Sequence, residues 1–192
     1  MSAVWCQRIV SAISAAALAL AAGVTVAAGN DKEEVGTFHA RLTGFQEVPS
    51  VSTVARGEFK GKLDPRTGFI DYEFSYEGLQ GKARQAHIHF GQRSVNGVIV
   101  VWLCQTSFNT APAGLNPQPP TCGEQAGSFT GVINASSVIV APPQGSTVHP
   151  QQLSTGELAE LIKAIRAGVA YVNVHTDISP GGEIRGELRH RP

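Results

Sequence analysis

The sequence predicts an all-β fold, an antiparallel β-sandwich that carries one short helix near residues 155–167. Three observations support this fold class. Short segments that alternate between apolar and polar residues recur along the chain. Turn-forming residues separate them, with 21 glycines and 11 prolines among 192 residues. One stretch alone has the periodicity of a helix. Short strands at near-regular spacing, joined by tight turns, are typical of sandwiches and barrels.

Nine segments have the pattern of a strand. In residues 70–77, apolar side chains alternate with polar ones, so one face of the strand is buried and the other is exposed. We expect residues 97–103 to lie at the centre of the fold, because they are apolar on both faces. The predicted strands are 38–42, 57–63, 70–77, 85–90, 97–103, 129–133, 137–140, 169–175 and 183–188.

A single amphipathic helix interrupts the strands. Residues 154–157 fit a capping box, in which Ser154 and Glu157 satisfy each other's free backbone amides. Gly168 provides a natural C-terminal stop. We expect this helix to lie across the end or edge of the sandwich. Its apolar stripe consists of Leu158, Leu161, Ile162 and Ile165.

The N-terminus predicts export. Residues 1–28 contain one basic residue, Arg8, followed by an apolar run and small residues near Ala28, as a signal peptide does. The alternative is an uncleaved anchor, because a run of ~20 weakly polar residues can span a bilayer. Both predict a secreted or periplasmic domain, and contact with a membrane only if the segment stays uncleaved. The single domain is predicted over residues 36–190.

Charge and motifs exclude several function classes. The chain has 15 basic and 15 acidic residues without a basic patch, so we expect no nucleic-acid partner. It contains no nucleophile elbow, no phosphate-binding glycine loop and no zinc-protease motif. The strand pattern predicts separate surface acids that form no catalytic carboxylate pair. These acids are Glu47, Glu58, Asp71, Glu73 and Glu77.

Two cysteines predict a disulfide. Removal of the first 28 residues takes away Cys6 and leaves Cys104 and Cys122, which enclose a proline-rich segment. An even number of cysteines in an exported chain favours a bridge, and closing a loop of this size would stabilise the fold by ~3 kcal/mol. The alternative is a pair of unrelated free thiols.

Three histidines form the candidate site. Because side chains at i and i+2 of a strand share a face, His87 and His89 point the same way, about 7 Å apart. His175 lies on the polar face of another predicted strand. If the two strands are neighbours, three imidazoles converge, as suits copper or zinc. The alternatives are a structural hydrogen-bond network and a site for another ligand.

Other residues have two interpretations each. Asp177 and Glu183 either orient a ligating imidazole through its second nitrogen or belong to a turn. His39 either joins the histidine patch or is an ordinary polar residue. Trp102, in an apolar strand, is expected to be in the core.

Three ordered motifs resemble those of the CHRD domain, a module named after chordin. Residues 38–49 resemble its opening, residues 86–91 its middle motif, and residues 170–176 followed by 180–186 its closing motif. The resemblance implies an immunoglobulin-like β-sandwich with a distant likeness to copper/zinc superoxide dismutases, and an extracellular or periplasmic location. In those dismutases a His-x-His strand supplies copper ligands, and His87 and His89 match that local pattern. No convincing ligands for a second metal are found, so we predict no dismutase activity.

Two hypotheses of function follow. The first is a non-catalytic extracellular or periplasmic binding or structural module with an unknown extracellular ligand or protein partner. The second is a mononuclear copper or zinc protein, either a metal carrier or a redox enzyme, that uses His87, His89 and His175. No catalytic residues are predicted by either hypothesis.

Overall fold

A computed structural model describes residues 36–141 and 149–191. The predicted signal peptide lies outside the described residues. Strands form most of the regular structure, and α1 (Leu158–Arg166) is the α-helix of the described part. Two single turns of 3-10 helix cover Gly44–Gln46 and Ala135–Ser137. The strands are β1 (Thr37–Thr43), β2 (Arg56–Asp64), β3 (Phe69–Glu77), β4 (Ala83–Phe90), β5 (Val98–Cys104), β6 (Gly127–Ile133), β7 (Ala170–Thr176), β8 (Ile184–Glu187) and β9 (Arg189–Arg191).

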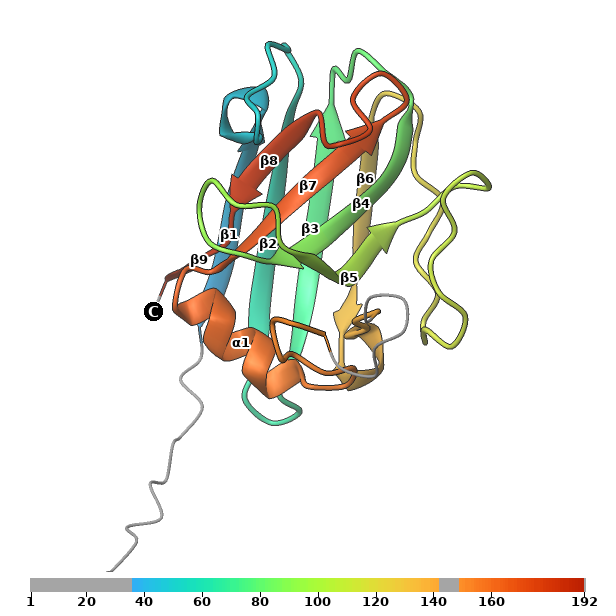
Figure 1. The fold of residues 1–192 in the computed structure, drawn as a ribbon. Coiled ribbons are helices and arrows are strands. Elements are labelled where there is room, and N and C mark those ends of the chain that lie inside the picture. Colours follow the sequence, from blue (N-terminus) through green and yellow to red (C-terminus); the bar gives the residue numbers. More distant parts are fainter. Residues whose placement is uncertain (1–35, 142–148, 192) are drawn as a thin grey trace, which may run out of the picture. The chain divides into compact units, whose positions relative to one another are not determined.

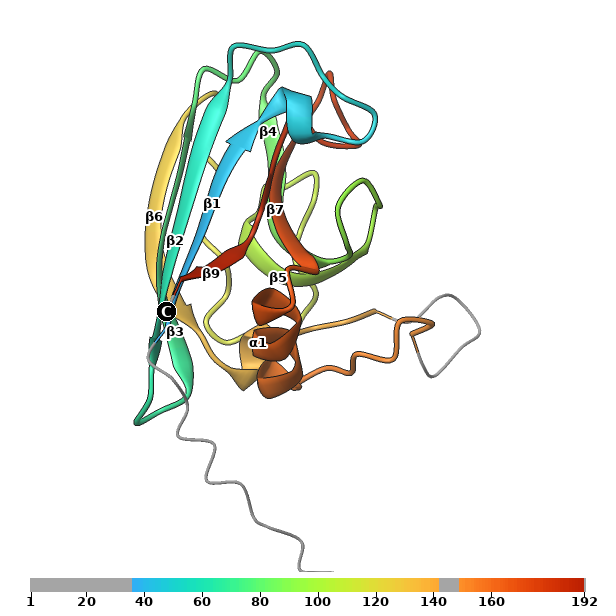
Figure 2. The same ribbon diagram turned by 90° about the vertical axis from the view of Figure 1, so that its left-hand side faces the viewer.

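The nine strands form one antiparallel sheet that folds back on itself. The strand order is β5-β4-β7-β8-β1-β2-β3-β6, and β9 pairs with β1 beside this path. Figure 1 and Figure 2 show that the half containing β4 and β7 packs over the half containing β1, β2, β3 and β6, while α1 lies at one end. The result is a nearly closed, barrel-like sheet. The predicted all-β class is therefore confirmed.

The hydrophobic core fills the space between the two halves of the sheet. Phe59 and Phe74 come from one half, and Ile88 and Val172 come from the other; each is at most 1 % exposed. Because side chains alternate across a strand, every second residue of β4 and β7 points into this core. The residues between them point to the opposite face, away from the hydrophobic cluster.

The helix has the predicted apolar stripe but begins later than predicted. Half of the capping box forms, in which the Ser154 amide donates to Glu157 Oε2 at 2.7 Å. The helix α1 itself starts at Leu158. The C-terminus is a Schellman motif. Gly168 has φ +71 and donates to the Ile165 carbonyl, and the following residue donates to the Ala164 carbonyl.

Two predictions about strands are wrong. The apolar segment at β5 lies at the edge of the sheet and not at its centre. Residues 137–140 form no strand; they make a single bridge, Val138 with Val101, and the Ile139 amide donates to the Val100 carbonyl. This segment lies along β5, so Val100 and Val101 of the edge strand are buried without a full strand beside them.

The predicted disulfide is confirmed. Cys104, the last residue of β5, is bonded to Cys122. The chain on both sides of the bridge is paired, because the Gln105 amide donates to the Pro120 carbonyl and the Cys122 amide donates to the Gln105 carbonyl. The proline-rich loop is thus fastened to the end of β5.

Candidate metal site

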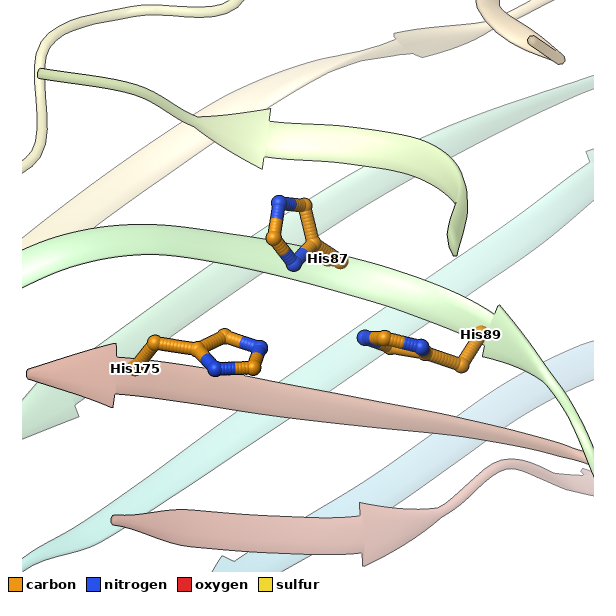
Figure 3. Close-up of side chains that lie close together, drawn as sticks. All are labelled: His87, His89 and His175. Carbon is orange, nitrogen blue, oxygen red and sulfur yellow. The ribbon is translucent and has the colours of Figure 1, made fainter. Parts of the chain in front are cut away.

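The three histidines lie on two neighbouring strands. β4 carries His87 and His89, and β7, which pairs with it in antiparallel register, carries His175. In this register His87 is opposite Asn173 and His89 is opposite Tyr171. All five side chains occupy the face that points away from the hydrophobic core. Figure 3 shows the three imidazole rings turned toward one another.

The separations suit a single ion. One nitrogen from each ring lies within 4.8 Å of the other two. An ion at the centre of a triangle of that edge would be at most about 2.8 Å from each nitrogen, compared with about 2.0–2.1 Å in a zinc–histidine bond. Each ring therefore needs to move inward by less than about 1 Å to reach bonding distance.

Main-chain carbonyls orient two of the rings. His89 Nδ1 lies 3.0 Å from the Gly97 carbonyl oxygen, and His175 Nδ1 lies 2.9 Å from the Pro180 carbonyl oxygen. A carbonyl can only accept, so in both rings Nδ1 carries the hydrogen and Nε2 keeps its lone pair. A ligating histidine typically donates its second nitrogen in this way. The geometry thus presents two Nε2 lone pairs to the centre of the cluster.

Burial keeps the rings neutral. His87, His89 and His175 are 0 %, 6 % and 8 % exposed. Burial lowers the pKa of His87 well below its usual value, and the neighbouring His89 and His175 lower it further. Burial lowers the pKa of His89 to about 4, although hydrogen bonding to the Gly97 carbonyl acts in the other direction. It also lowers the pKa of His175. Neutral imidazole is the form that binds metal.

Unsatisfied polar atoms concentrate at this place. In the described part of the chain, seven buried side-chain nitrogen or oxygen atoms have no hydrogen-bond partner. Five of them belong to this cluster: both nitrogens of His87, Nε2 of His89, Nε2 of His175 and Oδ1 of Asn173. Buried polar atoms nearly always have a partner, because an unpaired one costs about 1–3 kcal/mol. The cluster therefore has the character of a binding site.

Aromatic side chains enclose the histidines. Trp102 of β5 contacts His87 edge-on, with ring centroids 4.3 Å apart, and Tyr171 stacks parallel on His89 at 4.7 Å. Arg185 of β8 stacks on Tyr171, its guanidinium carbon 3.3 Å from the ring centroid. Trp102, predicted as a core residue, is half-buried and packs against the histidine cluster.

The chain matches the CHRD domain family over residues 38–188, most of its length. It belongs to the CHRD domain family. No curated protein and no solved structure matches the chain. The CHRD domain contains all three histidines, and the described residues include no helix long and apolar enough to cross a bilayer.

Glu47 of the CHRD domain is not the surface acid that the sequence predicted. It is 4 % exposed, and burial raises its pKa to about 7, although the charge of Arg185 and hydrogen bonds from Val48 and Asn173 act in the opposite direction. Arg185 is itself 1 % exposed and donates to main-chain carbonyls of residues 92 and 95. The strand pattern gave no indication that Glu47 is buried, because this residue lies in a loop.

The predicted accessory residues lie elsewhere in the CHRD domain. Glu183 is buried and accepts hydrogen bonds from the Thr53 and Thr176 hydroxyls and from two backbone amides. It therefore joins loops, and it forms no hydrogen bond with the three imidazoles of the described site. Asp177 accepts from the Lys82 amide in a turn. His39 is outside the cluster and bonds to Glu58 at 2.9 Å on β2.

Proposed function

We propose that this CHRD protein is an exported metal-binding protein that holds one copper or zinc ion through His87, His89 and His175. One observation carries the proposal: three buried imidazoles each bring one nitrogen to within 4.8 Å of the other two, and their rings hold four nitrogen atoms without a hydrogen-bond partner. A purely structural network would pair these nitrogens with each other or with neighbours, because an unpaired buried nitrogen is unfavourable.

The donor set also supports the proposal. Imidazole suits zinc and copper, and buried, neutral rings need lose no proton before they bind. The carbonyls of Gly97 and Pro180 hold two rings with Nε2 directed inward, so little conformational freedom remains to be lost on binding. When bound, a copper ion would supply one-electron chemistry and a zinc ion would supply a Lewis acid.

The proposal names a binding function and no reaction. It is compatible with the hypothesis of a non-catalytic binding or structural module, because a buried ion can stabilise such a module or be its cargo. Export is part of the proposal and is supported by the N-terminal pattern, by the disulfide and by the extracellular or periplasmic location of CHRD domains. The proposal also includes a single domain over residues 36–190 and an immunoglobulin-like or dismutase-like sandwich.

Metal analysis tests the proposal. The wild-type protein, the double variant His87→Ala/His89→Ala and the control His39→Ala are purified from an oxidising compartment, and the metal content of each is measured. We expect about one ion per chain in the wild type and the control, and none in the double variant. Equal metal content in all three proteins would refute the site.

A measurement on the wild type alone covers the case in which the double variant does not fold. Copper(II) is added to the metal-free protein, and its electron paramagnetic resonance spectrum is recorded. Three imidazole ligands predict nitrogen hyperfine structure from directly bound nitrogens. A spectrum of copper bound only by oxygen, or weak binding without saturation at one ion per chain, would overturn the proposal.

A further inference from the structure

Asn173 lies on the same face of β4 and β7 as the three histidines. It lies opposite His87 in the register of β4 and β7, and it precedes His175 by two residues on the same face of β7. Its side chain is therefore adjacent to ligands on both strands. The residue is 2 % exposed, and its Oδ1 has no hydrogen-bond partner. A buried amide oxygen without a donor is unfavourable, so it needs a partner that the described residues do not supply.

The lone pairs of the cluster cannot satisfy one another. Nε2 of His89 and Nε2 of His175 keep their lone pairs, because Nδ1 of each ring donates to a main-chain carbonyl. Oδ1 of Asn173 carries lone pairs as well, so it cannot form a hydrogen bond with either Nε2 atom. A positive ion is a partner that all three atoms can share.

We propose that Asn173 Oδ1 is the fourth donor to the ion held by His87, His89 and His175. This inference rests on the proposed function and adds a residue to it. Three nitrogens and one amide oxygen give a four-coordinate site made entirely by the protein. A zinc site whose four ligands are protein groups is typical of a structural or storage role, whereas a catalytic site keeps one position for water.

The proposal has a consequence for which ion binds. An amide oxygen is a harder donor than imidazole and favours divalent ions over copper(I). With Asn173 as a ligand, the site prefers zinc(II) or copper(II) to copper(I). A neutral set of four donors also leaves the full positive charge of the ion inside the protein, and the buried carboxyl of Glu47, which interacts with Asn173, is available to balance it.

Two substitutions and one control test the role of Asn173. Asn173→Leu keeps the size of the side chain and removes the oxygen, whereas Asn173→Asp replaces it with a stronger, charged donor. Gln85→Leu removes an amide from the same face of β4, opposite His175 but outside the cluster. Zinc affinity of each protein is measured by competition with a chelator of known affinity.

We expect Asn173→Leu to weaken zinc binding about tenfold or more, because loss of even an outer-shell partner of a ligand costs about 10- to 100-fold in affinity. Asn173→Asp should strengthen zinc binding, and Gln85→Leu should leave it unchanged. Equal affinity of wild type and Asn173→Leu would overturn the inference while leaving the histidine site intact. A wild type that binds no metal would instead refute the proposed function, and the inference with it.

A measurement on the unaltered protein removes the dependence on folded variants. The copper(II) protein is transferred to water enriched in ¹⁷O, and the line width of its paramagnetic resonance spectrum is compared with that in ordinary water. With Asn173 as the fourth donor, no broadening is expected. Broadening by ¹⁷O would show that a water molecule occupies the position, and would overturn the assignment to Asn173.

Discussion

Glu47 should make the metal-free protein less stable as the pH rises, and Glu47→Gln should remove this effect. Burial raises the pKa of Glu47 to about 7, whereas the reference value for an exposed glutamate is 4.5. Between these values the folded protein binds more protons than the unfolded chain does. The free energy of unfolding therefore falls as the pH rises through this interval.

The size of the effect follows from the two pKa values. Each unit of difference corresponds to about 1.4 kcal/mol, so the ionised carboxylate destabilises the fold by about 3 kcal/mol once the pH is well above 7. Attraction to Arg185 is included in this value, because it acts on the pKa of Glu47 in the opposite direction to burial. Glutamine has nearly the same shape but no charge, so the variant should be more stable than the wild type at high pH.

Urea denaturation measures the difference. The free energy of unfolding of both proteins is determined at pH 5 and pH 8 in the presence of a chelator. We expect the advantage of Glu47→Gln to be about 2.5 kcal/mol larger at pH 8 than at pH 5. Titration of the histidines affects both proteins alike and cancels in the comparison. An advantage of equal size at the two pH values would show that Glu47 is not a buried, protonated acid.

Three further experiments test the framework around the site. Glu183→Ala should lower the free energy of unfolding by about 3 kcal/mol, because it leaves buried hydroxyl and amide donors unpaired. Asp177→Ala, at an exposed turn residue, should lower it by less. Similar losses for the two variants would contradict a special role for Glu183. Replacement of Cys104 and Cys122 by alanine should lower the free energy of unfolding by about 3 kcal/mol, since the bridge closes a loop with a sequence separation of 18. An unchanged midpoint of urea denaturation would refute this prediction. Gly168→Ala should lower the free energy of unfolding by about 1 kcal/mol and with it the thermal midpoint, because alanine is strained at the φ of +71 that Gly168 adopts. A gain in stability would contradict the Schellman motif.

Alternation along the strands predicted the geometry of the candidate site. The period of two places His87 and His89 on one face of β4, and Tyr171, Asn173 and His175 on one face of β7, as the structure shows. What the sequence left open was whether β4 and β7 are neighbours. Strands adjacent in space but about 80 residues apart in the chain are brought together by the whole topology, which no local pattern contains.

Residues outside the strand pattern could not be predicted in the same way. Glu47 is buried because a loop folds over the outer face of the sheet, beside Arg185. The apolar β5 is an edge strand, yet the bridge between Val101 and Val138 and the disulfide-fastened loop at Cys104 cover it. In each case the burial comes from an irregular segment, whereas local sequence patterns describe only regular ones.

The separation of core and histidine cluster by one pair of strands has a consequence for how such a protein changes over generations. Ala86, Ile88 and Val172 maintain the packed interior, while the intervening positions carry the candidate metal ligands. If the proposed ion binding is under selection, that selection and selection on folding act on alternate positions of the same strands. A descendant that abandons the ion can replace the histidines one at a time and keep its scaffold, and its sequence would still show the apolar half of the pattern.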